Sequence, residues 1–244
     1  MKILLTGHKG FIGKVLFDRL WLKGHTLTGL DLKDGDDLNT CSLAYDDIDL
    51  VIHLAGKSGL RGSVTDPGPY WTHNVEASRK LFTAFKNTKI LYASSSSAYE
   101  PGLNPYAASK FMVEQIAPDN ALGMRFHTVY SNTPRQGMFL DKLLKGELKY
   151  ITDHSRDFIH IEDLCDAIEL ILDKDLTGII DIGNGESIPI QSLASGWPIH
   201  LNTVHERKVT KANIEILQNL GFKPKYNIKK FLTNKKLGTI IKKH

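Results

Sequence analysis

Short apolar runs alternate with longer segments of helical periodicity over the first half of the chain. The apolar runs predict strands, and the longer segments predict helices at Phe11–Leu22, Asn74–Phe85 and Tyr106–Ile116. The predicted strands are Ile3–Leu5, Thr26–Asp31, Leu50–Leu54, Ile90–Ala93 and Leu122–Phe126. Strands that alternate with helices favour an α/β fold, in which a doubly wound parallel sheet carries helices on both faces. Such sheets bind ligands at the carboxyl ends of their strands.

The pattern becomes less regular after about Ser131. Helices are predicted at Met138–Leu144 and Glu162–Leu172, and one more strand at Ile179–Ile182. A last helix is predicted near Lys211–Leu220, because a glycine and then a proline follow it and form a typical helix stop. We therefore divide the chain into residues 1–130 and a smaller, partly interleaved region, 131–244.

The turn between the first predicted strand and helix is rich in glycine. Gly7, Gly10 and Gly13 let the backbone approach a diphosphate closely, and the N–H groups at Phe11 and Ile12 open the helix behind them. Asp31 ends the next strand, 18 residues after Gly13, where a carboxylate accepts hydrogen bonds from the adenosine ribose and repels a 2′-phosphate. Residues 1–130 are thus predicted to bind a dinucleotide, with NAD favoured over NADP.

Composition narrows the class of protein further. With 41% apolar and 24% charged residues, the 244-residue chain resembles an ordinary soluble globular protein. We see no leader pattern and no apolar stretch approaching a membrane span, so no membrane partner is expected. Cys41 and Cys165 have neither metal nor redox spacing, which favours free thiols in the cytoplasm. No metal site is expected.

Positive charge gathers near the C-terminus. Residues 205–244 hold 11 of the 31 Lys and Arg residues. Such a tail can bind nucleic acid or an anionic surface. We interpret these lysines as solvated residues on terminal helices and expect no nucleic-acid partner.

A second group of residues is typical of proton transfer. Tyr106 and Lys110 are four residues apart in a predicted helix that Pro105 opens, so they share one face. An ammonium group near a phenol stabilises the phenolate, which makes such a tyrosine an acid or base near neutral pH. Four serines, 94–97, end the preceding strand, and one of them could orient a reacting hydroxyl.

These motifs together resemble the extended short-chain dehydrogenase/reductases, and specifically the NAD-dependent nucleotide-sugar epimerase/dehydratase group. The matches run through nearly the whole chain, from the glycine turn to the segments Arg156–Asp163, Ile182–Glu186 and Leu220–Pro224. The resemblance implies a Rossmann-type fold with a small C-terminal substrate-binding region. It also implies NAD as cofactor, a nucleotide-diphosphate sugar as substrate, and a homodimer.

The resemblance assigns roles to individual residues. Tyr106 would transfer the proton, Lys110 would hold the nicotinamide ribose, and Ser95, four residues before Tyr99, would be the active serine, with Ser96 as the other candidate. Beside the cofactor it places Leu54, Ala55, Gly56 and Asn74. As substrate contacts it places Arg61 and Ser63 of the loop 61–67, the diphosphate-binding Arg156, and Arg207.

The residues after Ser95 help to choose the reaction. Members of the family that eliminate water usually carry an Asp-Glu pair directly after the active hydroxyl residue, whereas this chain has Ser96, Ser97 and Ala98. This difference favours an epimerase that acts at sugar carbon 4 through transient oxidation to a 4-keto intermediate. A nucleotide-sugar reductase or dehydratase of the same family remains an alternative, as does a non-catalytic NAD-binding sensor or scaffold.

The chain also departs from the family pattern. Only ten residues separate Ser95 from Tyr106, where longer members have a sizeable loop, and the C-terminal region is short. We therefore expect an open pocket or a small sugar.

Overall fold

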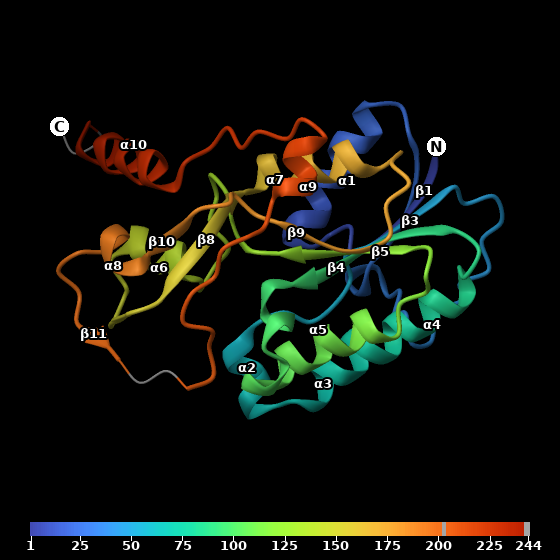
Figure 1. The fold of residues 1–244 in the computed structure, drawn as a ribbon, viewed down its shortest axis with the longest axis horizontal. Coiled ribbons are helices and arrows are strands. Elements are labelled where there is room, and N and C mark those ends of the chain that lie inside the picture. Colours follow the sequence, from blue (N-terminus) through green and yellow to red (C-terminus); the bar gives the residue numbers. More distant parts are fainter. Residues whose placement is uncertain (202–203, 242–244) are drawn as a thin grey trace. The chain divides into compact units, whose positions relative to one another are not determined.

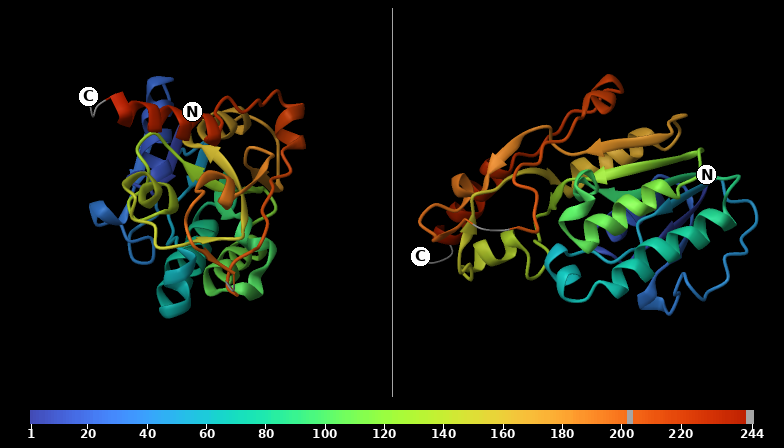
Figure 2. Two further views of the ribbon diagram at one scale, coloured as in Figure 1. Left: turned by 90° about the vertical axis from the view of Figure 1, so that its left-hand side faces the viewer. Right: turned by 60° about the horizontal axis from the view of Figure 1, so that its bottom comes forward.

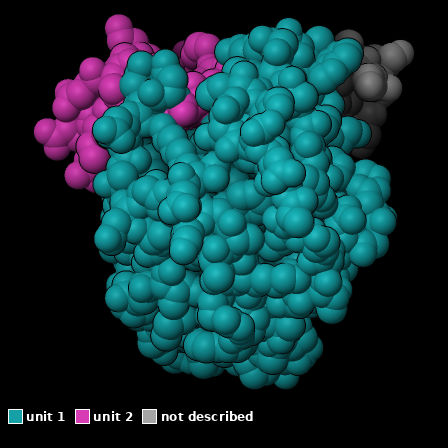
Figure 3. Space-filling view, turned by 90° about the vertical axis from the view of Figure 1, so that its right-hand side faces the viewer, with its two compact units in different colours: residues 1–126, 173–181, 204–207 teal, residues 127–172, 182–203, 208–244 magenta. Residues whose placement is uncertain are grey.

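The computed structural model describes residues 1–201 and 204–241, with the side chains of 236–241 excluded. By internal contacts, the chain divides into two compact units, which Figure 3 colours separately. Unit 1 comprises residues 1–126, 173–181 and 204–207, and unit 2 comprises 127–172, 182–203 and 208–244. The main segment of unit 1 thus ends at Phe126, and two short later segments return to it.

A six-stranded sheet in the order β2-β1-β3-β4-β5-β9 forms the centre of unit 1. The pairs from β2 through to β5 are all parallel. This confirms the predicted doubly wound parallel sheet. The bounds of the strands are β1 (Lys2–Thr6), β2 (Thr26–Leu30), β3 (Leu50–His53), β4 (Lys89–Ser95), β5 (Ala121–Phe126) and β9 (Gly178–Ile182). The core strands are almost wholly apolar because helices cover both faces.

Helix α1 (Phe11–Leu22) lies on one face of the sheet, and α4 (Ala77–Ala84) and α5 (Pro105–Gln115) lie on the other (Figure 1 and Figure 2). The predicted helix at Asn74–Phe85 is confirmed, although its first part belongs to a π-helical stretch, η2 (Trp71–Glu76), that runs into α4. The shorter helical elements of this unit are η1 (Leu32–Asp34), α2 (Leu60–Thr65), α3 (Gly68–Tyr70), η3 (Ser96–Tyr99) and η4 (Pro101–Leu103).

The chain reverses direction across the sheet between β1 and β3. After β1 it crosses to β2 on one side, and it then returns to β3 on the other side of β1. Adjacent loops that depart to opposite sides leave a crevice at the carboxyl ends of such strands, which is the usual ligand position in this fold class. The glycine turn follows β1, and Leu54, Ala55 and Gly56 follow β3, so both segments lie at this point.

Unit 2 is built around a small sheet of its own. Strand β8 (Ser155–His160) pairs in parallel with β6 (Thr128–Tyr130) and antiparallel with β10 (Ser187–Pro189). Its buried apolar core includes Tyr130, Phe158 and Ile188. The other elements are β7 (Ile151–Thr152), β11 (Ile199–His200), α6 (Phe139–Lys145), α7 (Ile161–Ile171), α8 (Ile190–Leu193), α9 (Glu215–Asn219) and α10 (Ile228–Ile241).

The prediction of a helix near Lys211–Leu220 is wrong for residues 211–214. The structure has only α9, from Glu215 to Asn219. Upstream of it, the backbone N–H of Thr210 donates to the Ser155 carbonyl, and that of Ala212 donates to the Asp157 carboxylate. These bonds hold the segment extended against β8. The Ala212 N–H is one of the donors that the buried Asp157 carboxylate needs, since a buried carboxylate without donors would be costly.

Among the described residues, the structure contains neither a helix that could cross a membrane nor a cluster of metal-ligating side chains.

Candidate active site

The glycine turn after β1 is packed against the end of β3. Gly7 has φ of +74°, and a Cβ there would lie 2.6 Å from the Ala55 nitrogen. A Cβ on Gly13 would lie 2.0 Å from the Gly7 carbonyl oxygen, and the Gly10 N–H donates to that same oxygen at 2.9 Å. Side chains at Gly7 and Gly13 would therefore force the turn and α1 apart.

No side chain caps the N-terminus of α1. Gly10 occupies the N-cap position without a side-chain hydrogen bond, and Phe11 and Ile12 are the first residues of the helix. The first N–H groups of a helix have no partner inside the helix and attract anions. The N-terminus of α1 therefore offers N–H groups to an anion, and the glycines of the turn leave the backbone open to it. This arrangement suits a diphosphate.

Asp31 lies directly after β2 and is 8% exposed. One carboxylate oxygen accepts the Lys9 N–H and the other accepts the Lys33 N–H, each at 2.9 Å. These bonds fix the carboxylate beside the glycine turn. A carboxylate oxygen accepts more than one hydrogen bond, so capacity remains for ribose hydroxyls. The turn and Asp31 together fit the adenosine diphosphate half of a dinucleotide.

The segment after β3 connects the turn to the helix that carries Lys110. A Cβ on Gly56 would lie 2.8 Å from the Asn74 Oδ1 and 3.4 Å from the Lys110 Nζ. Asn74 accepts the Lys57 N–H at 2.7 Å and donates to the Ser109 Oγ at 2.8 Å. Asn74 thus links the loop after β3 to α5 through hydrogen bonds. Because Gly56 has no side chain, the Lys110 ammonium can lie close to that loop.

Helix α5 begins as its sequence indicated. Pro105 stands in the first turn, and the Asn104 side chain caps the helix by accepting the Ala107 N–H at 2.8 Å. The Ser63 hydroxyl accepts the N–H of Tyr106 at 3.1 Å, a contact that sequence reasoning missed. The Ser63 hydroxyl also donates to the Leu60 carbonyl, so this buried residue joins α2 to the start of α5.

Lys110 is buried, and its ammonium donates to the Ala93 carbonyl at 2.9 Å. Burial lowers the pKa of Lys110 to about 8, against the opposing effect of the Glu114 carboxylate. Ala93 lies two residues before Ser95, so this bond places Lys110 at the carboxyl end of β4. Tyr106, one turn earlier on α5, has its ring edge against Tyr70, with centroids 6.2 Å apart.

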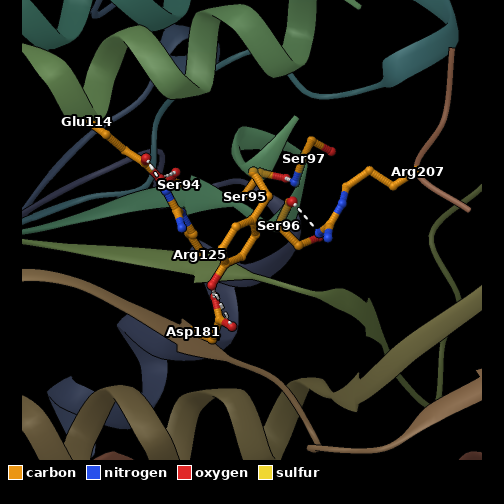
Figure 4. A network of polar contacts seen from close by, with 9 residues as sticks. Ser94, Ser95, Ser96, Ser97, Glu114, Arg125, Asp181 and Arg207 are labelled. Atoms are coloured by element: carbon orange, nitrogen blue, oxygen red, sulfur yellow. Dashed lines mark hydrogen bonds and ion pairs between the residues drawn. The ribbon is translucent and has the colours of Figure 1, made fainter. Parts of the chain in front are cut away.

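Ser95 is the last residue of β4 and is 8% exposed. Its hydroxyl oxygen accepts the Ser97 N–H at 3.1 Å and thereby caps η3. The hydroxyl proton stays available for a bond to another oxygen. Ser96 begins η3, and its carbonyl accepts a hydrogen bond from Arg207 at 2.9 Å (Figure 4).

The three candidate arginines bond to other protein groups. Arg61, on α2, pairs with Glu206 at 3.2 Å. Arg207 pairs with Glu100 at 2.8 Å. Arg156 is in unit 2, where it donates to the Ser155 carbonyl and contacts His154. Arg61 was expected in the loop 61–67 but lies on helix α2. The part of all three arginines in substrate binding stays a prediction.

The geometry of unit 1 fits a class of protein, the dinucleotide-binding domains, and its helix α5 carries Tyr106 and Lys110 one turn apart. Residues 3–183 match the family model described as the NAD dependent epimerase/dehydratase family. The chain therefore belongs to the NAD dependent epimerase/dehydratase family, whose members are enzymes. This confirms the resemblance seen in the sequence, and NAD is the cofactor of the family.

Individual relatives agree with this assignment. The chain is 30% identical over 254 residues to the uncharacterized UDP-glucose epimerase YtcB of Bacillus subtilis, with 80% of each chain covered. It is 26% identical to UDP-glucuronate 4-epimerase 2 of Arabidopsis thaliana, covering 80% of this chain and 63% of the relative.

Solved structures show the same fold. MoeE5 in complex with UDP-glucose and NAD superposes with a TM-score of 0.84 at 25% identity, and the match covers both chains completely. The UDP-glucuronic acid 4-epimerase of Bacillus cereus, in complex with UDP-glucuronic acid and NAD, gives a TM-score of 0.81 at 26% identity, covering 96% and 97% of the two chains.

Selectivity for NAD should depend on the charge of Asp31. We expect Asp31→Asn to weaken NAD binding by about 10–100-fold, the usual effect of losing a charge-assisted hydrogen bond. The ratio of the affinities for NAD and NADP should fall as well. Titration of both cofactors by calorimetry or fluorescence measures this. Asp49→Asn is a matched control, since Asp49 also accepts a backbone N–H, from Lys2 at 2.7 Å, but lies before β3. Equal NADP preference in the wild type and Asp31→Asn would contradict the assignment.

Proposed function

We propose that this protein is a 4-epimerase of a UDP-hexose or UDP-hexuronate. The names of its relatives support this substrate class, because they include UDP-glucose and UDP-glucuronate epimerases. The observation that carries the proposal is the bond from the Lys110 ammonium to the Ala93 carbonyl, two residues before Ser95 on β4, with Tyr106 one helical turn before Lys110 on α5. The glycine turn and Asp31 follow β1 and β2 of the same sheet.

Tyr106 is the proposed acid and base. As a phenolate it takes the proton from the sugar 4-hydroxyl, and as a phenol it returns a proton to the same oxygen. The ammonium of Lys110, one turn along α5, stabilises the phenolate and can donate to the ribose hydroxyls of the cofactor. The Ser95 hydroxyl donates to the reacting oxygen and keeps it within reach of Tyr106.

When bound, NAD supplies a reversible hydride acceptor for carbon 4 of the sugar. The chain's part is to hold the 4-keto sugar so that either of its faces can be used. A 4-keto sugar loses water only if a base removes the proton at carbon 5, while an acid protonates the leaving hydroxyl. Ser96, Ser97 and Ala98, which follow Ser95, offer neither group. The favoured outcome is therefore restoration of the alcohol, in which hydride returns to carbon 4 and Tyr106 returns its proton to oxygen 4.

The diphosphate contacts are proposed to be Arg156 and Arg207, and Arg61 and Ser63 are proposed to lie at the sugar. A guanidinium group donates in a planar fork that suits phosphate oxygens. Residues 131–244 would then supply most of the substrate-binding region. The expected homodimer is also part of this proposal and is tested by sedimentation of the purified protein.

In the decisive experiment, the purified protein and NAD are incubated with one nucleotide sugar at a time. The sugars are UDP-glucose, UDP-glucuronic acid, and dTDP- and GDP-sugars. We expect the 4-epimer of a UDP-sugar, detected by proton NMR of the anomeric region, and retention of deuterium placed at carbon 4. A product lacking water would indicate a dehydratase, and consumption of NADH or NADPH supplied in a parallel incubation would indicate a reductase. Tight NAD binding without any turnover would overturn the proposal in favour of a sensor or scaffold.

A further inference from the structure

A largely buried ion pair joins α5, the helix that carries Tyr106 and Lys110, to β5. Glu114, on α5, has a fully buried side chain. Its carboxylate accepts two hydrogen bonds from the Arg125 guanidinium, at 2.8 and 2.7 Å, and a third from the Ser94 hydroxyl (Figure 4). None of the assigned catalytic roles uses this carboxylate.

Glu114 and its partner Ser94 lie close to Lys110 and Ser95 in the sequence. Glu114 is one turn after Lys110, and Ser94 immediately precedes Ser95. Two successive residues of β4 therefore bond to two successive turns of α5: the Ala93 carbonyl to Lys110, and the Ser94 hydroxyl to Glu114. Such a two-point attachment fixes where α5, and hence Tyr106, lies along β4.

Arg125, the other member of the pair, comes from β5 and contacts Tyr99, which bonds to β9. The Arg125 guanidinium, from β5, lies 4.0 Å from the centre of the Tyr99 ring. The Tyr99 hydroxyl donates to the Asp181 carboxylate, on β9, at 3.1 Å. Arg207 contacts the same ring at 5.0 Å. Arg125 is thus held between Glu114 and Tyr99, and its bonds to Glu114 raise its pKa.

Charge links the pair to Lys110. Burial lowers the pKa of Lys110, and Glu114 is the group that raises it. His53, on β3, has its pKa lowered to about 3 by burial and by the charge of Lys110, so it is neutral at physiological pH and offers no compensation. The other titratable or charged groups on elements packed against α5 are Arg61, Tyr70, His73, Glu76, Lys89, Tyr92 and Tyr99, and Glu100 lies between two of these elements, η3 and η4.

We propose that Glu114 is a positioning residue of the reaction, which balances the buried ammonium of Lys110 and, through Ser94, holds Ser95 in register with Tyr106. Arg125 makes this possible because its two hydrogen bonds orient the buried carboxylate. The assignment rests on the proposed function, since it concerns the same proton transfer.

The first test measures Lys110 directly, in protein without cofactor or sugar. Lysine labelled with ¹³C at the ε position is titrated by NMR, and Lys110→Arg identifies the resonance. We expect a midpoint near 8 in the wild type and a fall of about one pH unit in Glu114→Gln, which keeps the shape of the side chain and removes its charge. Glu114→Asp, which keeps the charge, should leave the midpoint near its wild-type position.

The second test measures kcat and KM across pH. We expect the alkaline limb of kcat in Glu114→Gln to move to lower pH by the same amount, with KM for the UDP-sugar within about twofold of the wild type. Ser94→Ala should lower kcat about tenfold and leave the Lys110 midpoint in place, because it removes a contact but no charge. This variant also tests the positional role if Glu114→Gln fails to fold.

Leu20→Val, at a fully buried position of α1, is the control for a general loss of stability. It should move neither the titration midpoint nor the pH profile. An unchanged midpoint in folded Glu114→Gln, or an unchanged kcat in Ser94→Ala, would overturn the corresponding half of the inference. If the wild type converts no sugar, the proposed function fails, while the NMR titration still decides whether Glu114 sustains the charge of Lys110.

Discussion

Replacing Tyr106 with phenylalanine should lower kcat for epimerisation by about 10²–10⁴-fold, the range that a positioned acid or base contributes. The variant loses the hydroxyl that carries the proton but keeps the ring, which packs against Tyr70. The bond from the Tyr106 N–H to Ser63 is also unaffected, because it involves only the backbone of residue 106. NAD affinity and melting temperature should therefore stay close to the wild type.

Tyr92→Phe provides the matched control. Tyr92 is buried on β4, and burial raises the pKa of its phenol, so it cannot supply a phenolate at physiological pH. We expect this variant to keep its activity within a few-fold of the wild type when initial rates are compared at saturating NAD. Substantial epimerisation by Tyr106→Phe would rule out Tyr106 as the proton-transferring residue.

Gly13→Ala should abolish measurable NAD binding or weaken it by more than about 100-fold. The added Cβ would lie 2.0 Å from the Gly7 carbonyl oxygen and 2.9 Å from the His8 Cα, and both are backbone atoms that cannot rotate away. Either α1 must move off the sheet or the turn must open, and overpacking of this kind typically costs about 1–3 kcal/mol or more. Both changes displace the N–H groups that would face the diphosphate.

Isothermal titration with NAD, together with thermal melting, measures this effect. Gly68→Ala is the control, because no atom lies within 4 Å of the position of its Cβ, at the start of α3, and its φ is not positive. It should bind NAD as the wild type does. If Gly13→Ala bound NAD within about twofold of the wild type, the glycine turn would not be the diphosphate site.

Local sequence was sufficient for the elements of unit 1. Each strand of the central sheet is a short apolar run next to a turn, and α1 has the predicted bounds, Phe11–Leu22. The position of Asn104 before Pro105 sets the start of α5. These signals are read from neighbours within a few residues, so one chain is enough to see them. Tyr106 and Lys110 could be paired for the same reason, since one helical turn separates them.

Contacts between distant residues could not be predicted in this way. The extended segment before α9 has helical periodicity, yet it bonds to β8, more than fifty residues earlier in the chain. The bond from Ser63 to Tyr106 spans 43 residues, and the one from Tyr99 to Asp181 spans 82. No local pattern marks either partner.

The sequence by itself determined the order of strands and helices, the glycine turn, Asp31 and the tyrosine–lysine helix, because each depends on short-range spacing and backbone preference. Only the tertiary structure decided what surrounds Lys110. Its carbonyl partner on β4, and the Arg125 that orients Glu114, come from other strands. The charge of a buried group depends on all the neighbours that replace water, and those neighbours are brought together only by folding.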